Sequence, residues 1–317
     1  MANKKCKVPY FAVLLVTFAI LIAGIVVTAV FGINLGFKEA GGTQIRVNLE
    51  SAISTQVKPV VEDVLADNNI AIDSMFIEDK ETTSYFVVNI ADKSIENIDA
   101  VEAKIAAALQ IDRASVSNVV VNSTIKSEVY LAIGLVIVGL IVAILLFGLF
   151  RYRVAGGLAL AFTFLVQIML PLSIVFCTRI QLSLGGIVAI IASAILMVLF
   201  AIIMLEKYRA ATRGKDLNDG DEQTIMGDAV KSSAETIIFV LAALVIISVA
   251  LMFVGSLASL MIGLVSLVST IVLAFVSFMI LPKTNVALGE ITRLRFEAYL
   301  SKNNSPAPTK KKENNKK

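Results

Sequence analysis

The residues of this chain that could carry proton or ion chemistry stand at the ends of its apolar stretches. Glu206, Lys207 and Arg209 follow directly after the uncharged stretch 182–205. A charged side chain inside a membrane is costly and persists mainly where it has a function, whereas charges at the end of a span mark its boundary with water. We therefore interpret these three residues as the exit of a membrane helix and not as a buried relay.

Six apolar stretches must position these groups, and each is about as long as a helix that crosses a bilayer. In lipid such stretches are expected to be helical, because no water is present to satisfy open backbone groups. Gln167 is their most polar side chain, and we interpret it as a buried hydrogen-bonding group between helices. The six stretches, none of which contains Asp, Glu, Lys, Arg or His, are 10–31, 129–150, 154–177, 182–205, 236–254 and 257–281.

Small residues form a stripe on two of these expected helices. In the fourth stretch they recur at every fourth position, and a similar face begins in the sixth. Small side chains allow two membrane helices to approach closely. We therefore expect helix packing at Gly185, Gly186, Ala189, Ala192, Ser193, Ser259 and Gly263.

The composition narrows the class of function. The 317 residues are 57% hydrophobic, which is typical of a protein with several membrane spans. There is no His, and the two cysteines, Cys6 and Cys177, are expected on opposite sides of the membrane. Because no phosphate loop or catalytic triad pattern is visible either, we expect no enzyme activity, no catalytic residues, no metal or cofactor site and no nucleic-acid partner.

The first apolar stretch and the segment after it predict an anchor followed by a turn and a strand. The stretch is longer than the core of a secretory signal peptide, so we expect an uncleaved transmembrane helix. Residues 43–50 alternate between apolar and polar side chains, which indicates a half-buried strand. Gly41 and Gly42 directly before it allow a tight turn where a side chain would clash.

Residues 32–127 are expected to form a small α+β domain between the first two membrane helices. Alternating and helical spacings of apolar residues predict a strand, a helix, two strands, a helix and a final strand. This order is that of the ferredoxin-like arrangement. About 80 residues suffice for such a domain, although its core is small.

The distribution of Lys and Arg predicts the orientation. Basic residues lie in segment 1–9, at Arg151 and Arg153, in the expected polar loop 206–235 and in the tail 282–317, which places these parts in the cytosol. Between Lys38 and Lys126 there are 8 basic and 14 acidic residues, so the α+β domain is expected outside. The chain is thus predicted to be an α-helical polytopic membrane protein with six transmembrane helices, a five-helix bundle at 128–281 and both termini in the cytosol. Pro282 is expected to end the sixth helix.

The chain resembles the SecF subunit of the SecD/SecF protein-export family. Gly36, Gly41, Gly42 and Thr43 match the SecF signature G-I-D-F-x-G-G-T after the first helix. The sequence from Gly186 to Arg209 is similar to the family's fourth membrane helix, with its G-I-x-x-x-I/L start and its acidic-basic-x-basic exit. The layout of one span, an outside domain and five further spans is also that of SecF.

The resemblance implies an accessory subunit of the Sec translocase in the cell membrane. Its partners would be a SecD-type subunit, the Sec channel, translocating polypeptides and membrane lipids, with no cofactor. The family carries an Asp where this chain has Leu199 or Phe200, and an Arg where it has Phe239 or Val240. We therefore expect this chain to have no proton coupling of its own.

Two other functions are compatible with the same spans. One is half of a small-molecule or lipid exporter of the resistance-nodulation-division type, although such halves usually carry much larger outside domains. The other is a membrane-anchored interaction domain without transport. Co-purification with the translocon distinguishes the Sec role from both, and lipid or drug sensitivity of a deletion strain would favour the exporter.

Overall fold

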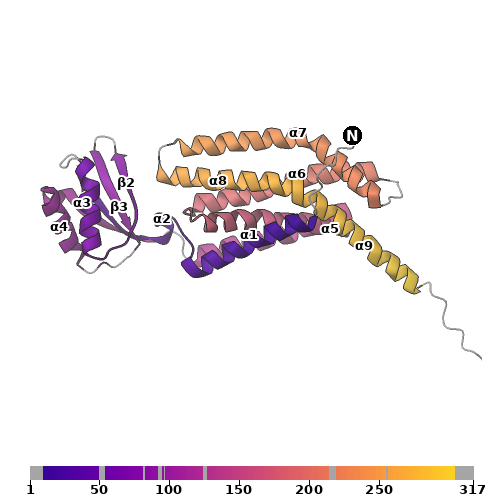
Figure 1. Ribbon diagram of the computed structural model, residues 1–317, viewed down its shortest axis with the longest axis horizontal. Helices are drawn as coiled ribbons and strands as arrows, with labels where there is room; N and C mark the ends of the chain where they lie inside the picture. Colours follow the sequence, from indigo (N-terminus) through magenta and orange to yellow (C-terminus); the bar gives the residue numbers. More distant parts are fainter. Residues whose placement is uncertain are drawn as a thin grey trace, which may run out of the picture.

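The computed structural model describes two parts of the chain, a small four-stranded domain and a long helix bundle (Figure 1). The structure describes residues 10–49, 54–80, 83–91, 95, 97–123, 127–213, 219–254 and 256–303. The N-terminal lysines, Cys6 and the end of the basic tail lie outside these ranges.

The small domain has the predicted order of strands and helices. Its four strands form one antiparallel sheet in the order β2-β3-β1-β4. A short 3-10 turn, Arg113–Ser115, precedes the last strand. The elements are β1 (Gly42–Asn48), α3 (Ser54–Asp67), β2 (Ile72–Lys80), β3 (Thr83–Ile90), α4 (Ile98–Leu109) and β4 (Val116–Val121).

The two faces of this sheet have different surroundings. Ile45 and Val47 point from β1 into a core that also contains Val61 of α3 and Ile105 of α4. Both helices lie on the side of the sheet away from the bundle (Figure 1). Since side chains alternate along a strand, Gln44 and its neighbours on the other face point toward the bundle end.

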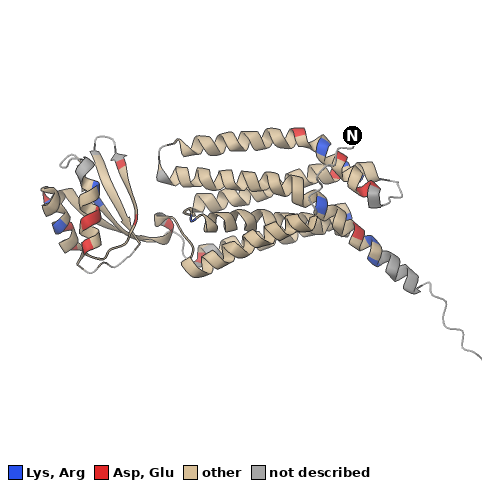
Figure 2. Cartoon of the chain, viewed as in Figure 1, with Lys and Arg blue, Asp and Glu red and all other residues tan. Residues whose placement is uncertain are grey.

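The helix bundle contains five helical segments that are long and apolar enough to cross a membrane, counted among the described residues. Many large apolar side chains on their outer surfaces are exposed, as expected of helices that face lipid. Charged residues gather in the small domain and at the opposite end of the bundle (Figure 2). The five segments are α1 (Tyr10–Phe31), α5 (Ser127–Cys177), α6 (Leu184–Thr212), α7 (Asp219–Met252) and the continuous pair α8 (Leu257–Phe275) and α9 (Leu281–Asn303).

The long segment α5 contains a reversal at Arg153. This residue has φ 62° and ψ −172°, which is outside the helical region. A Cβ placed on Gly148 would lie 2.6 Å from the Cα of Gly157, so the backbones on either side of the reversal touch. The reversal falls between the stretches 129–150 and 154–177 that the sequence separates.

The described residues of the expected polar loop 206–235 are almost all helical, which differs from the prediction. Helix α6 continues to Thr212 and α7 already begins at Asp219. Met226 and Ala229 are buried against the bundle. The polar stretch therefore has an apolar face, and covering that face stabilises the helix beyond the span.

The sixth expected helix also does not end at Pro282. A π-helical turn at Val276–Ile280 joins α8 to α9, and Pro282 is the second residue of α9. Proline lacks an N–H and clashes with the carbonyl four residues earlier in a regular helix. The wider turn changes the hydrogen-bond register before the proline, so the chain can continue as a helix.

Candidate functional site

The segment that follows α1 is bound to the link that precedes α6. The Gly36 N–H donates to the Leu182 carbonyl at 3.1 Å, and the Leu182 N–H donates to the Asn34 carbonyl at 2.8 Å. These bonds form a short parallel bridge between Leu35 and Leu182. The bridge fixes the entry of the small domain against the end of the helix bundle.

Glu39 adds a side-chain cap to the same place. Its Oε1 accepts a hydrogen bond from the Leu184 N–H at 3.0 Å, and the Ser183 Oγ accepts one from the Gly186 N–H at 3.2 Å. The first N–H groups of α6 are thereby satisfied, and a carboxylate near a helix N-terminus is favourable. The capping role of Ser183 can be read from its position, but nothing in the sequence links Glu39 to a helix 145 residues away.

The signature glycines Gly41 and Gly42 are required for two different reasons. Gly41 has φ 75°, a conformation that residues with a side chain rarely adopt. A Cβ on Gly42 would lie 2.2 Å from the Ile90 carbonyl oxygen and 2.7 Å from the Phe37 ring. The first glycine therefore makes the turn, and the second lets β1 approach β3. Thr43, which follows them, is buried in the sheet.

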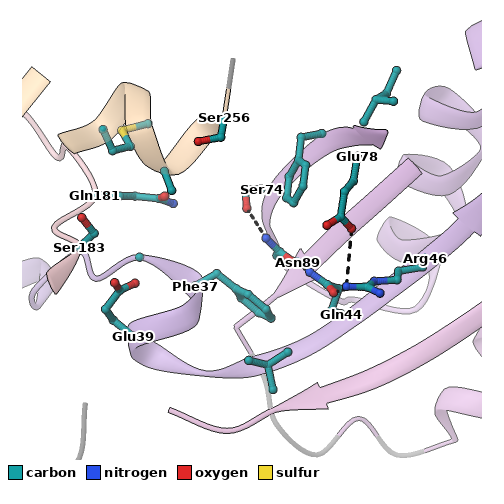
Figure 3. A pocket seen from close by; sticks show the side chains of 16 residues that line it. Phe37, Glu39, Gln44, Arg46, Ser74, Glu78, Asn89, Gln181, Ser183 and Ser256 are labelled. Atoms are coloured by element: carbon teal, nitrogen blue, oxygen red, sulfur yellow. Dashed lines mark hydrogen bonds and ion pairs between the residues drawn. The ribbon is translucent and has the colours of Figure 1, made fainter. Parts of the chain in front are cut away.

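A cavity of about 620 Å³ lies between the open face of the sheet and the bundle end. Figure 3 shows sheet residues on one side of it and the link before α6 and the start of α8 on the other. The sequence analysis did not identify this cavity, because its two walls are far apart in the chain. Its polar and charged lining residues are Glu39, Gln44, Arg46, Ser74, Glu78, Asn89, Gln181, Ser183 and Ser256.

A continuous series of hydrogen bonds crosses three strands on the floor of this cavity. Arg46 Nε donates to Gln44 Oε1 at 2.9 Å, and Gln44 Nε2 donates to Asn89 Oδ1 at 2.9 Å. Asn89 Nδ2 then donates to Ser74 Oγ at 3.0 Å. Arg46 also forms an ion pair with Glu78, with 3.6 Å between Nη2 and Oε2. The floor is thus a fixed array of polar groups.

Asp73 stands where the sheet meets the bundle end. Partial desolvation raises the pKa of its carboxyl above the ordinary value, and hydrogen bonds with Ser74 and Gln181 act in the opposite direction. Gln181 belongs to the link before α6, so this carboxyl connects β2 with the bundle.

The small residues expected at helix contacts have unequal surroundings. A Cβ on Gly185 would lie 2.6 Å from Ile262 Cδ1, and one on Gly263 would lie 2.8 Å from the Ser248 carbonyl oxygen. Gly186 and Ser193 are buried, whereas Ala189 and Ser259 are half-buried and Ala192 is exposed. Among these expected positions, Gly185 of α6 and Gly263 of α8 are the most closely packed.

Gln167 is fully buried inside the bundle. Its Nε2 donates to Ser193 Oγ and to the Ser269 carbonyl, both at 3.1 Å. It therefore joins α5, α6 and α8 by polar contacts in the middle of the bundle. Gln167 has no titratable group, and Leu199 and Phe200 of α6 have none either.

The charged exit of α6 is tied to the reversal in α5. Glu206 accepts hydrogen bonds from Arg151 and from the Tyr152 hydroxyl, the latter at 2.9 Å. Lys207 donates to the Ser232 carbonyl of α7, and Arg209 is exposed. This end of the bundle has structural contacts between charged groups and no enclosed acid-base pair among its described residues.

Comparison with known proteins finds solved structures with a similar fold. No protein-family model and no curated protein matches the sequence. A crystal structure of SecDF in its super-membrane-facing form is similar with a TM-score of 0.68 and 16% identity, over 92% of this chain and 39% of that one. A crystal structure of SecDF from Thermus thermophilus, described as a translocon-associated membrane protein, is similar with a TM-score of 0.65 and 16% identity. The match covers 89% of this chain and 38% of that one.

The match covers both the small domain and the helix bundle, since about nine-tenths of the chain is included. The chain spans about two-fifths of the length of the SecDF chains that it matches. It is therefore a multi-pass membrane protein with the fold of one part of SecDF.

Proposed function

We propose that this chain is a SecF-type accessory subunit of the Sec protein-export machinery. The observation that carries the proposal is the SecDF-like fold over nearly the whole chain, together with the signature glycines at the entry to the small domain. The match covers about two-fifths of SecDF. The proposal includes a SecD-type partner, because the resemblance to the SecD/SecF family implies one.

The proposal includes a definite topology. In this proposal α5 forms two spans that meet at Arg153, so the chain has six spans, and the small domain is ferredoxin-like and lies outside. The non-helical backbone of Arg153 and the strand order β2-β3-β1-β4 support it. Both termini then lie in the cytosol of a cell whose plasma membrane holds the protein. The distribution of Lys and Arg supports this orientation.

In this role the subunit does not move protons by itself. Its apolar stretches contain no Asp, Glu, Lys, Arg or His, and an aliphatic side chain cannot relay a proton. Either the partner supplies the titratable groups, or the assembly does not couple export to proton movement. In the second case it acts as a scaffold and as a chaperone on the outer side of the membrane. The chain is proposed to have no enzyme activity in either case.

Crosslinking in native membranes tests the proposal. The tagged chain, crosslinked and purified, is expected to bring down the Sec channel and a SecD-type subunit, identified by mass spectrometry. A tagged multi-pass protein of unrelated fold, at matched abundance, is the control. Recovery of exporter components without any translocon subunit would contradict the Sec assignment.

A further inference from the structure

We propose that β4 of the small domain pairs edge to edge with β4 of a second copy of this chain. The order β2-β3-β1-β4 makes β2 and β4 the two edges of the sheet, and β4 pairs with β1 alone among the described strands. An edge strand presents a row of open N–H and C=O groups to which another strand can bind. The proposal goes beyond the Sec role and does not depend on it.

The two edges of the sheet differ in their protection against such pairing. β2 carries three acidic residues and a lysine, whereas β4, with the sequence VSNVVV, carries no charge and no proline. Charged side chains on an edge hinder pairing, and like charges placed opposite each other on two strands are destabilising. Two copies of β2 would meet this barrier, and two copies of β4 would not.

Two valines of β4 are exposed on opposite faces of the sheet. Val119 is 44% exposed and Val120 is 53% exposed. Val116 points from the same strand into the core between the sheet and its helices, so by alternation Val120 points to the helix side and Val119 to the open face. An added strand would cover apolar surface on both faces, and this burial favours pairing.

The orientation of the sheet suits two copies in one membrane. Two antiparallel neighbouring strands of identical chains are related by a two-fold axis perpendicular to their sheet. Since α3 and α4 cover one face and the other face is turned toward the bundle end, this axis runs along the bundle (Figure 1). Two copies that cross the same membrane in the same direction require a two-fold axis of this direction. Because the membrane already aligns both copies, part of the rotational cost of association is removed.

The same axis restricts the register of the two strands. An axis perpendicular to the sheet keeps each face on one side, so one residue must lie opposite its own copy. With Val119 at the axis, it lies opposite Val119 of the second copy, and Ser117 lies opposite Val121. This register brings both exposed valines into the pairing and uses only residues of β4, so the 3-10 turn before the strand stays outside it.

The helix that follows β4 is open to a neighbour. α5 begins at Ser127, six residues after β4 ends at Val121. The first half of α5 has an exposed apolar stripe, and no other described helix covers it. A second bundle can therefore stand beside this part of α5 without displacing a helix. The stripe consists of Leu131, Leu135, Val138 and Val142.

Disulfide crosslinking in native membranes tests the inference. In the full-length chain with Cys6→Ser and Cys177→Ser, Val119→Cys places one thiol of each copy at the axis, where copper phenanthroline oxidises the pair to a disulfide. Ser117→Cys, exposed on the same face of β4, is the control. Its two copies would be offset by four residues of strand, about 13 Å, which is beyond the reach of a disulfide.

We expect a disulfide-linked dimer for Val119→Cys and none for Ser117→Cys. Co-expression of a Ser117→Cys chain with a Val121→Cys chain should restore the crosslink, because these two residues lie opposite each other in the proposed register. Equal crosslinking of Val119→Cys and Ser117→Cys would indicate random collision, and no crosslink at Val119 would mean that the edges do not meet. Either result would overturn the inference.

A charge placed on the edge gives a second measurement. Val119→Lys would put two ammonium groups opposite each other at the axis, whereas Ile77→Lys makes an equally exposed change on β2, the other edge. Two differently tagged copies, co-expressed and extracted in mild detergent, should co-purify in the wild type and in Ile77→Lys, and this co-purification should be lost in Val119→Lys. Protease resistance of the domain checks that both variants fold. Co-purification that survives Val119→Lys would contradict the β4 contact.

This contact and the Sec role fail in different ways. Recovery of the translocon without a Val119 crosslink leaves the Sec role standing and removes the β4 contact. A Val119 crosslink without recovery of the translocon has the opposite meaning. If tagged copies co-purify only when a SecD-type subunit is present, and no Val119 crosslink forms, that subunit joins them and the inference is overturned.

Discussion

Arg151 holds Glu206 with two parallel hydrogen bonds, Nε to Oε1 at 2.7 Å and Nη2 to Oε2 at 3.0 Å. The pair joins the reversal in α5 to the end of α6, 55 residues later in the chain. Planar bidentate pairing of this kind is geometrically specific, and lysine cannot reproduce it. The charged exit that the sequence suggested is thus part of a contact between two helices.

This pair is expected to contribute a small, measurable stability. Both side chains are partly exposed, so solvent screens the pair and the coupling free energy is expected to be small. A double-mutant cycle of Arg151→Ala and Glu206→Ala, followed by thermal unfolding in detergent, measures it. The coupling should decrease at high salt, while the local Asp228–Lys231 pair on α7 gives a value near zero. A zero coupling for Arg151 and Glu206 at low salt would show that the contact adds nothing.

Gly42→Ala is expected to destabilise the small domain. The new Cβ would meet the Ile90 carbonyl oxygen at 2.2 Å, and this backbone atom can only move by disturbing the pairing of β1 with β3. Such overpacking costs about 1–3 kcal/mol. Hydrogen exchange of the β1 and β3 amides checks the effect, with Ala107→Ser on the exposed side of α4 as control. Unchanged protection in the Gly42→Ala variant would mean that the strand can shift freely.

Two helix glycines are expected to be sensitive to a single methyl group. In Gly24→Ala the new Cβ would lie 2.5 Å from Ser173 Cβ, and in Gly263→Ala 2.8 Å from the Ser248 carbonyl oxygen. We expect each to lower bundle stability by about 1–3 kcal/mol. Gly139→Ala, at a position with nothing within 4 Å, should be neutral or slightly stabilising. Equal unfolding temperatures for the three variants in detergent would show that the glycine contacts have no packing role.

The orientation is tested by cysteine labelling. Asp99 in the small domain and Asp228 on α7 have side chains that are 81% and 69% exposed. In a background with Cys6→Ser and Cys177→Ser, Asp99→Cys is expected to react with an impermeant thiol reagent from outside, and Asp228→Cys only after the membrane is opened. Replacing Cys177 matters because this thiol is exposed. Reversed labelling would rule out the proposed topology.

The raised pKa of Asp73 predicts a pH dependence of the small domain's stability. For an acid whose pKa is higher in the folded state, the stabilisation is complete below the unfolded-state pKa and is lost as pH rises through the folded-state pKa. Asp73→Asn keeps hydrogen-bonding capacity without the charge, so it should flatten this dependence and raise stability at neutral pH. Asp67→Asn on α3 is the control. Urea unfolding across the acidic range checks it, and an unchanged pH profile for Asp73→Asn would contradict this role.

The purified chain alone is expected to conduct no protons. Gln167 and its partners in the bundle have no titratable group, and the apolar stretches contain no charged residue. Liposomes with an internal pH-sensitive dye and an imposed pH gradient measure the flux. Flux above that of empty liposomes from this chain alone would falsify the prediction. Flux that appears only with a SecD-type partner would place the titratable groups in that partner.

The sequence by itself determined the apolar spans and the order of elements in the small domain. A segment that spans the lipid must satisfy its backbone groups within its own helix. The length of an uncharged apolar stretch is therefore enough to predict a membrane helix. The alternation at Ile45 and Val47 and the helical spacing around Ile105 are equally local, because they record which side of one element is buried. The turn at Gly41 could be predicted for the same reason, since a turn depends on adjacent residues.

Only the tertiary structure decided the features that depend on residues far apart in the chain. Glu39 caps α6, Gly42 is required by the Ile90 carbonyl, and Gln44 faces a cavity whose other wall belongs to the bundle. The helical course of 206–212 and 219–235 depends on packing that covers an apolar face, and the continuation through Pro282 depends on a preceding π-turn. Local patterns fix what one segment can form, whereas contacts between distant segments depend on how the whole chain packs.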